Sequence, residues 1–143
     1  MKIVLIWASN NPEKYGNKIL KDLLKKWYEV IPVNPKEEKI EWIHSHKILK
    51  TVPKNFDIIN FVVPANVTLQ ILKKYTKLLK NKKVWIQPWA EDDKVKNFLI
   101  ENQFEDYVTD SCIMIEKMLL STKKSQLIKS WDFFYISGKR IFQ

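Results

Sequence analysis

The fold of this 143-residue chain is decided by residues 3–33, which read IVLIWASNNPEKYGNKILKDLLKKWYEVIPV. Residues 3–6 form an unbroken apolar run rich in β-branched side chains, which is typical of a strand buried on both faces. A cluster of turn-forming residues follows at 8–12. Leucine and isoleucine then recur at helical spacing between lysines over residues 16–26, and a second apolar run occupies 29–33. The order strand, turn, helix and strand predicts one βαβ unit.

The same alternation continues along the chain. Residues 40–48 predict a short strand and turn, and apolar runs at 57–63 and 84–87 predict strands that end at prolines. One helix is expected between these two runs, with apolar residues along one side: Ile71, Leu72, Tyr75, Leu78 and Leu79. Another helix is expected from residue 91, and a last short strand at 106–109. We therefore expect an α/β fold, a Rossmann-like three-layer sandwich with a five- to six-stranded, mainly parallel sheet.

Length and composition predict one domain over residues 1–120 and a C-terminal extension of unassigned role over 121–143. The apolar stretch at 131–136 is compatible with an edge strand, a clasp on the domain or a contact in a homo-oligomer. No apolar run approaches the roughly 20 residues of a membrane span, so no membrane partner is expected. A single cysteine, Cys112, excludes an internal disulfide, and the cytoplasm is the expected location.

The net charge of +9 is made almost wholly by lysine. Of the 25 basic residues only Arg140 is arginine, the side chain that reads guanine and phosphate with a two-pronged fork. Specific nucleic-acid binding is therefore not expected. A basic surface also suits a small polyanionic ligand.

The loop after the first strand is the most informative candidate site. In an open parallel sheet, ligands bind at the carboxyl ends of the strands, near the point where the strand order reverses. A turn that leads into a helix offers unpaired N–H groups and the positive end of the helix dipole to a phosphate. Ser9, Asn10 and Asn11 add polar side chains, and Lys14 adds a positive charge. The competing interpretation is an ordinary helix N-terminus capped by Ser or Asn.

Signals for catalysis and for metal binding are weak. His44 and His46 would lie on the same side of a strand, but no third ligand accompanies them. Cys112 has no histidine near it in sequence and is interpreted as a structural thiol. The acidic run at 91–93 is expected at the start of a helix, where acids complement the dipole. No catalytic residue and no metal ligand is therefore predicted.

Several sequence blocks resemble the small CoA-binding-domain proteins, a family related to the CoA-binding domain of the succinyl-CoA synthetase alpha subunit. The resemblance covers about residues 1–118 and rests on blocks in the family's order and spacing: ASNNPEKYG at 8–16, YEVIPVNPK at 28–36, FDI at 56–58, VVP at 62–64, VWIQP at 84–88 and DSCI at 110–113. It implies that the first loop holds the phosphates of coenzyme A, that Lys36 meets the nucleotide end, and that Val63 and Pro64 pack on the cofactor. The residues expected to bind coenzyme A or an acyl-CoA are Trp7, Ala8, Ser9, Asn10, Asn11, Lys14, Tyr15, Gly16, Asn34, Pro35, Lys36, Val63, Pro64 and Gln87.

Four tryptophans stand where the family pattern has glycine: Trp7, Trp27, Trp42 and Trp89. The chain has only 2 glycines and 6 tryptophans, whereas glycine usually makes up about 7% of a protein. Some bacterial genetic codes read the codon UGA as glycine and others read it as tryptophan. We hypothesise that the four residues are glycines translated with the wrong code.

The sequence favours a non-catalytic module that binds coenzyme A or an acyl-CoA. One alternative is a nucleotide-dependent enzyme on the same fold, either an oxidoreductase or a ligase fragment. The first loop lacks the Gly-x-Gly-x-x-Gly spacing of dinucleotide-binding enzymes, which disfavours the oxidoreductase. The other alternative is a redox regulator in which Cys112 forms a mixed disulfide with coenzyme A. The distance of the Cys112 sulfur from the cleft would discriminate this redox regulator from the other functions.

Overall fold

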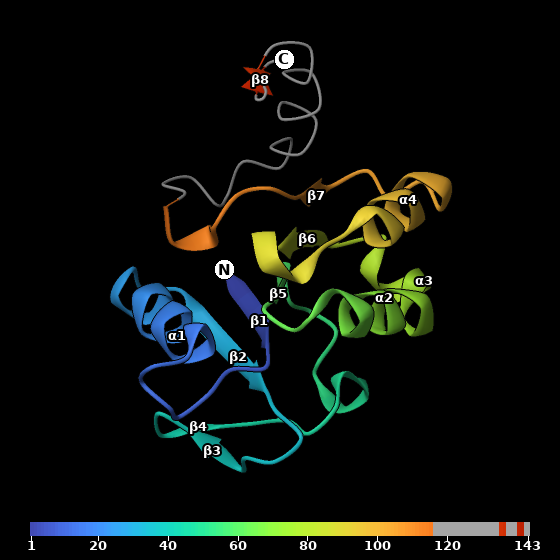
Figure 1. Ribbon diagram of the computed structural model, residues 1–143. Helices are drawn as coiled ribbons and strands as arrows, with labels where there is room; N and C mark the ends of the chain where they lie inside the picture. The colour runs from blue at the N-terminus through green and yellow to red at the C-terminus, as the bar shows by residue number, and fades with distance from the viewer. Residues whose placement is uncertain (116–134, 137–139, 142–143) are drawn as a thin grey trace.

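The protein is represented by a computed structural model in which residues 1–115, 135–136 and 140–141 are described (Figure 1). A five-stranded parallel sheet forms its centre, in the order β2-β1-β5-β6-β7. Its strands are β1 (Lys2–Ile6), β2 (Glu29–Val33), β5 (Ile58–Phe61), β6 (Lys83–Ile86) and β7 (Tyr107–Val108). The predicted α/β fold with a parallel sheet is confirmed.

Helices cover both faces of this sheet. Alternate residues of each strand point to opposite sides, and apolar side chains on both sides must be shielded from water. They are α1 (Tyr15–Lys25), α2 (Ala65–Lys74), α3 (Thr76–Leu79) and α4 (Asp93–Glu101), with short 3₁₀ turns η1 (Leu49–Thr51), η2 (Pro88–Ala90) and η3 (Ile113–Ile115). In β1, Ile3 and Leu5 pack with α1 and η3, whereas Val4 and Ile6 pack with α2, α3 and α4. The three layers of the expected sandwich are therefore present.

The strand order reverses between β1 and β5. From β1 the chain crosses to β2 on one side, and it later returns to β5 on the other side of β1. The loops that follow these two neighbouring strands diverge at the carboxyl edge of the sheet, which is where ligands bind in open α/β folds.

The single helix expected around residues 71–79 is two helices, because the chain leaves helical geometry at Tyr75 (φ −117°, ψ 30°). The Thr76 hydroxyl donates to the carbonyl oxygens of Leu72 at 2.7 Å and Lys73 at 3.1 Å. Such local side-chain bonds compete with the regular helical pattern.

Two short antiparallel pairs accompany the main sheet. The expected strand and turn at residues 40–48 is a hairpin of β3 (Lys39–Ile40) and β4 (Ile43–His44). Strand β8 (Tyr135–Ile136) pairs with β9 (Arg140–Ile141). The expected domain boundary at residue 120 lies outside the described residues. Among the described helices, none has the length and apolarity that a membrane crossing requires.

Candidate functional site

The loop between β1 and α1 folds back tightly onto the first turn of the helix. A Cβ atom placed on Gly16 would lie 2.2 Å from the carbonyl oxygen of Trp7, so no other residue fits there without moving the main chain. The N–H of Trp7 donates to the carbonyl oxygen of Val33 at 2.7 Å, which fixes the start of the loop against the end of β2.

Side chains of this loop stabilise its own backbone. The Ser9 hydroxyl accepts from the N–H of Asn11 at 3.0 Å, and the Asn11 side chain accepts from the N–H of Glu13 at 2.9 Å. No side chain caps α1, whose N-cap residue is Lys14. The alternative prediction, a helix N-terminus capped by Ser or Asn, is therefore wrong. The N–H of Asn17 donates to the carbonyl oxygen of Lys14 at 3.0 Å, whereas the N–H groups of Tyr15 and Gly16 are left for solvent or a ligand.

The loop after β2 lies against this first loop. The Asn34 side chain donates to the carbonyl oxygen of Ala8 at 2.8 Å and accepts from the N–H of Lys36 at 2.8 Å. The Asn10 side chain donates to the Glu37 carboxylate at 2.9 Å and to the carbonyl oxygen of Lys39 at 2.8 Å. The structure thus brings together residues 7–16 and 34–36, with Pro35 and Lys36 exposed, and their contact with a cofactor stays a prediction.

Two residues that the sequence reasoning missed support this arrangement. Asn17 is fully buried on α1, and its side chain donates to the carbonyl oxygen of Ser9 at 2.8 Å and to the Glu41 carboxylate at 3.0 Å. An asparagine at the apolar side of an amphipathic helix is a signal that could have revealed the contact. Glu41 has no such signal, because the hairpin places it there.

A buried polar network lies beneath the loops that follow β5, β6 and β7. The Gln87 amide oxygen accepts from the Asn60 side chain at 3.1 Å and from the N–H of Ile113 at 3.0 Å, and its amide nitrogen donates to the Cys112 sulfur at 3.1 Å. Gln87 and Asn60 are both fully buried. Asn60 was missed as well, although a polar residue inside the apolar strand β5 is a visible signal. The direct contact expected between Gln87 and a cofactor stays a prediction.

Aromatic side chains cross the carboxyl edge between the loops. The rings of Tyr15 and Trp89 lie with their centroids 4.5 Å apart, and the Trp89 indole N–H donates to the carbonyl oxygen of Val62 at 2.9 Å. Val62 directly precedes Val63, which is buried, and Pro64, which is exposed at the start of α2. Trp89 therefore links the N-terminus of α1 to the loop after β5, across the place where the strand order reverses.

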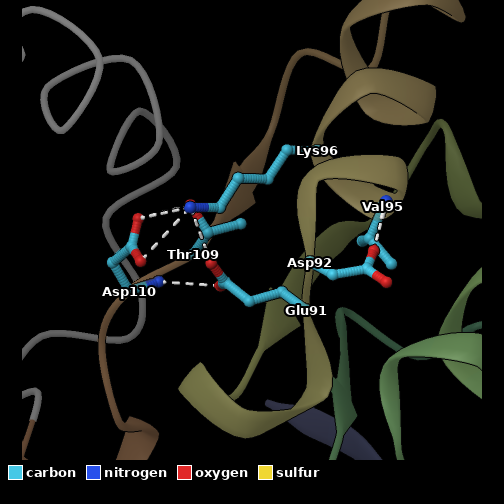
Figure 2. Close-up of polar contacts among 6 residues, drawn as sticks. All are labelled: Glu91, Asp92, Val95, Lys96, Thr109 and Asp110. Carbon is cyan, nitrogen blue, oxygen red and sulfur yellow. Dashed lines mark hydrogen bonds and ion pairs between the residues drawn. The ribbon is translucent and has the colours of Figure 1, made fainter.

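A charged cluster lies at the carboxyl ends of β6 and β7 (Figure 2). The Lys96 ammonium contacts the Glu91 carboxylate at 2.9 Å and the Asp110 carboxylate at 3.4 Å, and Glu91 also accepts from the N–H of Asp110 at 3.0 Å. The Glu91 side chain is only 5% exposed, and its burial outweighs the nearby ammonium and raises its pKa to about 7. Asp92 caps α4 by accepting from the N–H of Val95 at 2.9 Å, so this acid has the structural role expected of it.

The two histidines adjoin the loop after β2, where the carbonyl oxygen of His46 accepts from the N–H of Asn34 at 2.8 Å. The His44 and His46 rings meet edge to face at 5.0 Å, and burial together with His44 lowers the pKa of His46. They line an open hollow of about 610 Å³ together with Lys2 and Glu29, which begin β1 and β2. Within the described part of the chain, no three metal-binding side chains come together.

Both a protein-family model and several solved structures resemble this chain. A family model described as "CoA binding domain" matches residues 1–118. A conserved hypothetical protein from Pyrococcus furiosus is 45% identical, with a TM-score of 0.76 over 81% of this chain and 98% of that chain. A hypothetical protein from Pyrococcus horikoshii OT3 is 26% identical, with a TM-score of 0.69 over 78% of each chain.

Larger proteins contain a similar unit. The alpha subunit of the ADP-forming acetate–CoA ligase II of Pyrococcus furiosus is 37% identical over 73 residues, which is 49% of this chain but only 16% of that subunit. The dinucleotide-forming acetyl-coenzyme A synthetase 1 of Ca. Korarchaeum cryptofilum, solved in complex with phosphate and ADP, is 18% identical, with a TM-score of 0.60. It covers 76% of this chain and 25% of its own, and it shows the fold alone.

Proposed function

The chain belongs to the CoA binding domain family, and from this premise we propose that it binds coenzyme A or an acyl-CoA as a non-catalytic module. The observation that carries the proposal is the uncapped N-terminus of α1, held beside the strand-order reversal by the tightly folded loop of residues 7–14. The dipole of the helix and its free N–H groups favour a negatively charged ligand at this point.

The three loops suit different parts of the cofactor. The diphosphate would lie at the start of α1, where the ammonium group of Lys14 adds to the dipole. Lys36, exposed on the adjoining loop, would meet the nucleotide end. The exposed Pro64 would pack against the rest of the cofactor, and the buried Val63 would support that loop from the core side. The bonds of Asn34 and Asn10 hold the first two loops against each other, so that both lysines would be able to reach one ligand.

The proposal is tested by titrating the chain that carries glycine at positions 7, 27, 42 and 89 with coenzyme A. A ligand that binds only the folded state stabilises it by about 2.7 kcal/mol at a concentration of 100 times Kd. We expect the melting temperature to rise with coenzyme A, and calorimetry to give one site per chain. A melting temperature that stays constant up to millimolar coenzyme A would contradict the proposal.

Matched variants locate the ligand. Lys14→Ala and Lys36→Ala are expected to weaken binding about tenfold each, which corresponds to about 1.4 kcal/mol per charge-assisted contact. Lys73→Ala removes an exposed lysine from the last turn of α2, at the opposite end of that helix from Pro64, and is expected to leave binding unchanged. Equal effects of all three variants would indicate a general effect of charge and no defined site.

A second candidate function is favoured by the contact between Gln87 and Cys112. The amide N–H of Gln87 donates to the sulfur at 3.1 Å, which brings Cys112 beside a residue expected in the cofactor site. In this candidate the Cys112 thiolate attacks coenzyme A disulfide, forms a mixed disulfide and releases one coenzyme A thiolate. Non-reducing mass spectrometry would detect one adduct on the protein and none on Cys112→Ser. An unmodified protein after incubation with the disulfide would exclude this candidate.

A further inference from the structure

The tryptophans among the described residues fall into two groups. Trp85 behaves as an ordinary core tryptophan, since it is fully buried and its indole donates to the carbonyl oxygen of Ser111 at 2.8 Å. The other described tryptophans are exposed: Trp7 by 43%, Trp27 by 93%, Trp42 by 92% and Trp89 by 41%. Large apolar rings are seldom left in water in this number.

Trp27 occupies the glycine position of a helix terminus. Its φ is 67°, in the left-handed region, directly after the C-cap residue Lys26 of α1. The N–H of Trp27 donates to the carbonyl oxygen of Leu24 at 3.0 Å, and the N–H of Tyr28 donates to that of Leu23 at 3.1 Å. These two bonds define a Schellman motif, in which the residue at the Trp27 position is usually glycine.

Trp42 occupies the glycine position of a hairpin. Glu41 and Trp42 form the two-residue loop between Ile40 and Ile43, which are paired across β3 and β4. Their φ angles are 49° and 71°, and two positive values in a two-residue loop indicate a type I′ turn. Glycine is strongly preferred at the second of these positions. Trp42 is 92% exposed, so burial of its indole contributes little there.

Trp7 lies in the loop that would hold the phosphates, and its φ is 68°. The carbonyl oxygen of Trp7 is the atom that a Cβ on Gly16 would meet at 2.2 Å, so the main chain is crowded on this side. A backbone that turns through the left-handed region at such a close approach is where glycine is the default residue.

Trp89 differs, because its backbone φ is not positive and the argument there is steric. Its indole contacts Tyr15 and donates to the carbonyl oxygen of Val62, so it lies over the edge where the proposed ligand would enter. Glycine at this position would leave that edge open between the first loop and the loop after β5.

We infer that positions 7, 27, 42 and 89 are glycine in the protein as its cell makes it, with UGA codons read as glycine. Three of the six described non-glycine residues with positive φ are tryptophans, in three unrelated local motifs. The inference concerns the chain itself and does not depend on what it binds. It bears on the proposed function only at positions 7 and 89, where glycine in place of tryptophan would leave room for the ligand.

Sequencing peptides of the protein purified from its own cells tests the inference. Digestion at lysine gives peptides that span positions 7, 27, 42 and 89, and glycine is expected in each of them, with UGA at the same codons of the gene. Tryptophan in these peptides, or UGG codons, would overturn it. Glycine in the peptides together with a flat coenzyme A titration would leave this inference standing and would refute the proposed function instead.

Discussion

Replacing Trp27 with glycine is expected to raise the free energy of unfolding by about 1 kcal/mol. An L-residue in the left-handed region costs roughly 1–2 kcal/mol, and glycine avoids that cost. The greater freedom of glycine in the unfolded chain takes back about 0.4–1 kcal/mol. The Trp27 side chain is 93% exposed, so its removal loses little apolar burial. The net gain corresponds to a rise of roughly 3–6 °C in the melting temperature of a domain of this size.

Urea unfolding followed by far-UV circular dichroism measures this difference. The matched control is Trp27→Ala, which removes the same indole but keeps a Cβ at the left-handed position. The alanine variant is expected to unfold at nearly the same urea concentration as the unsubstituted chain, and the glycine variant at a higher one, with similar m-values. If the alanine and glycine variants are equally stable, the backbone at residue 27 carries no strain, and the argument from φ fails.

Two further predictions concern the tight loop and the buried carboxyl group. Gly16→Ala should lower the free energy of unfolding by about 1–3 kcal/mol, because the new Cβ would collide with the carbonyl oxygen of Trp7. The control is Lys18→Ala, two residues further along α1. Equal melting temperatures for the two variants would contradict the loop geometry. The pKa of Glu91 is raised from 4.5 to about 7, so between these pH values the folded state keeps a proton that the unfolded state releases. The free energy of unfolding should therefore fall as the pH rises from about 4.5 to about 7, by up to about 3 kcal/mol. Glu91→Gln should remove this part of the pH dependence of urea unfolding, and an unchanged slope would show that Glu91 is ionised throughout that range.

The sheet could be predicted because the sequence pattern and the burial agree. The apolar runs at residues 3–6, 57–63 and 84–87 are β1, β5 and β6, buried on both faces. Residues 7–16 and 34–36 could be expected to meet, because both loops follow neighbouring parallel strands. These predictions need only local periodicity and the topology of a parallel sheet.

The missed features depend on contacts between distant segments. Asn17 and Asn60 stand out in sequence as polar residues at apolar positions, but their hydrogen-bond partners are residues that only the fold brings there. The break at Tyr75 depends on which carbonyl oxygens the Thr76 hydroxyl reaches. The glycine positions were predicted by resemblance alone, whereas φ at residues 7, 27 and 42 gives an independent physical reason for them.

The Schellman end of α1 has a consequence for how genomes are read. Main-chain torsion angles are set by the whole fold. A position that requires glycine therefore keeps its positive φ even when the translated sequence assigns another residue to it. A survey of torsion angles over all proteins of one organism would therefore reveal a misassigned stop codon, because bulky aromatic residues would accumulate in the one region of the Ramachandran plot that they avoid.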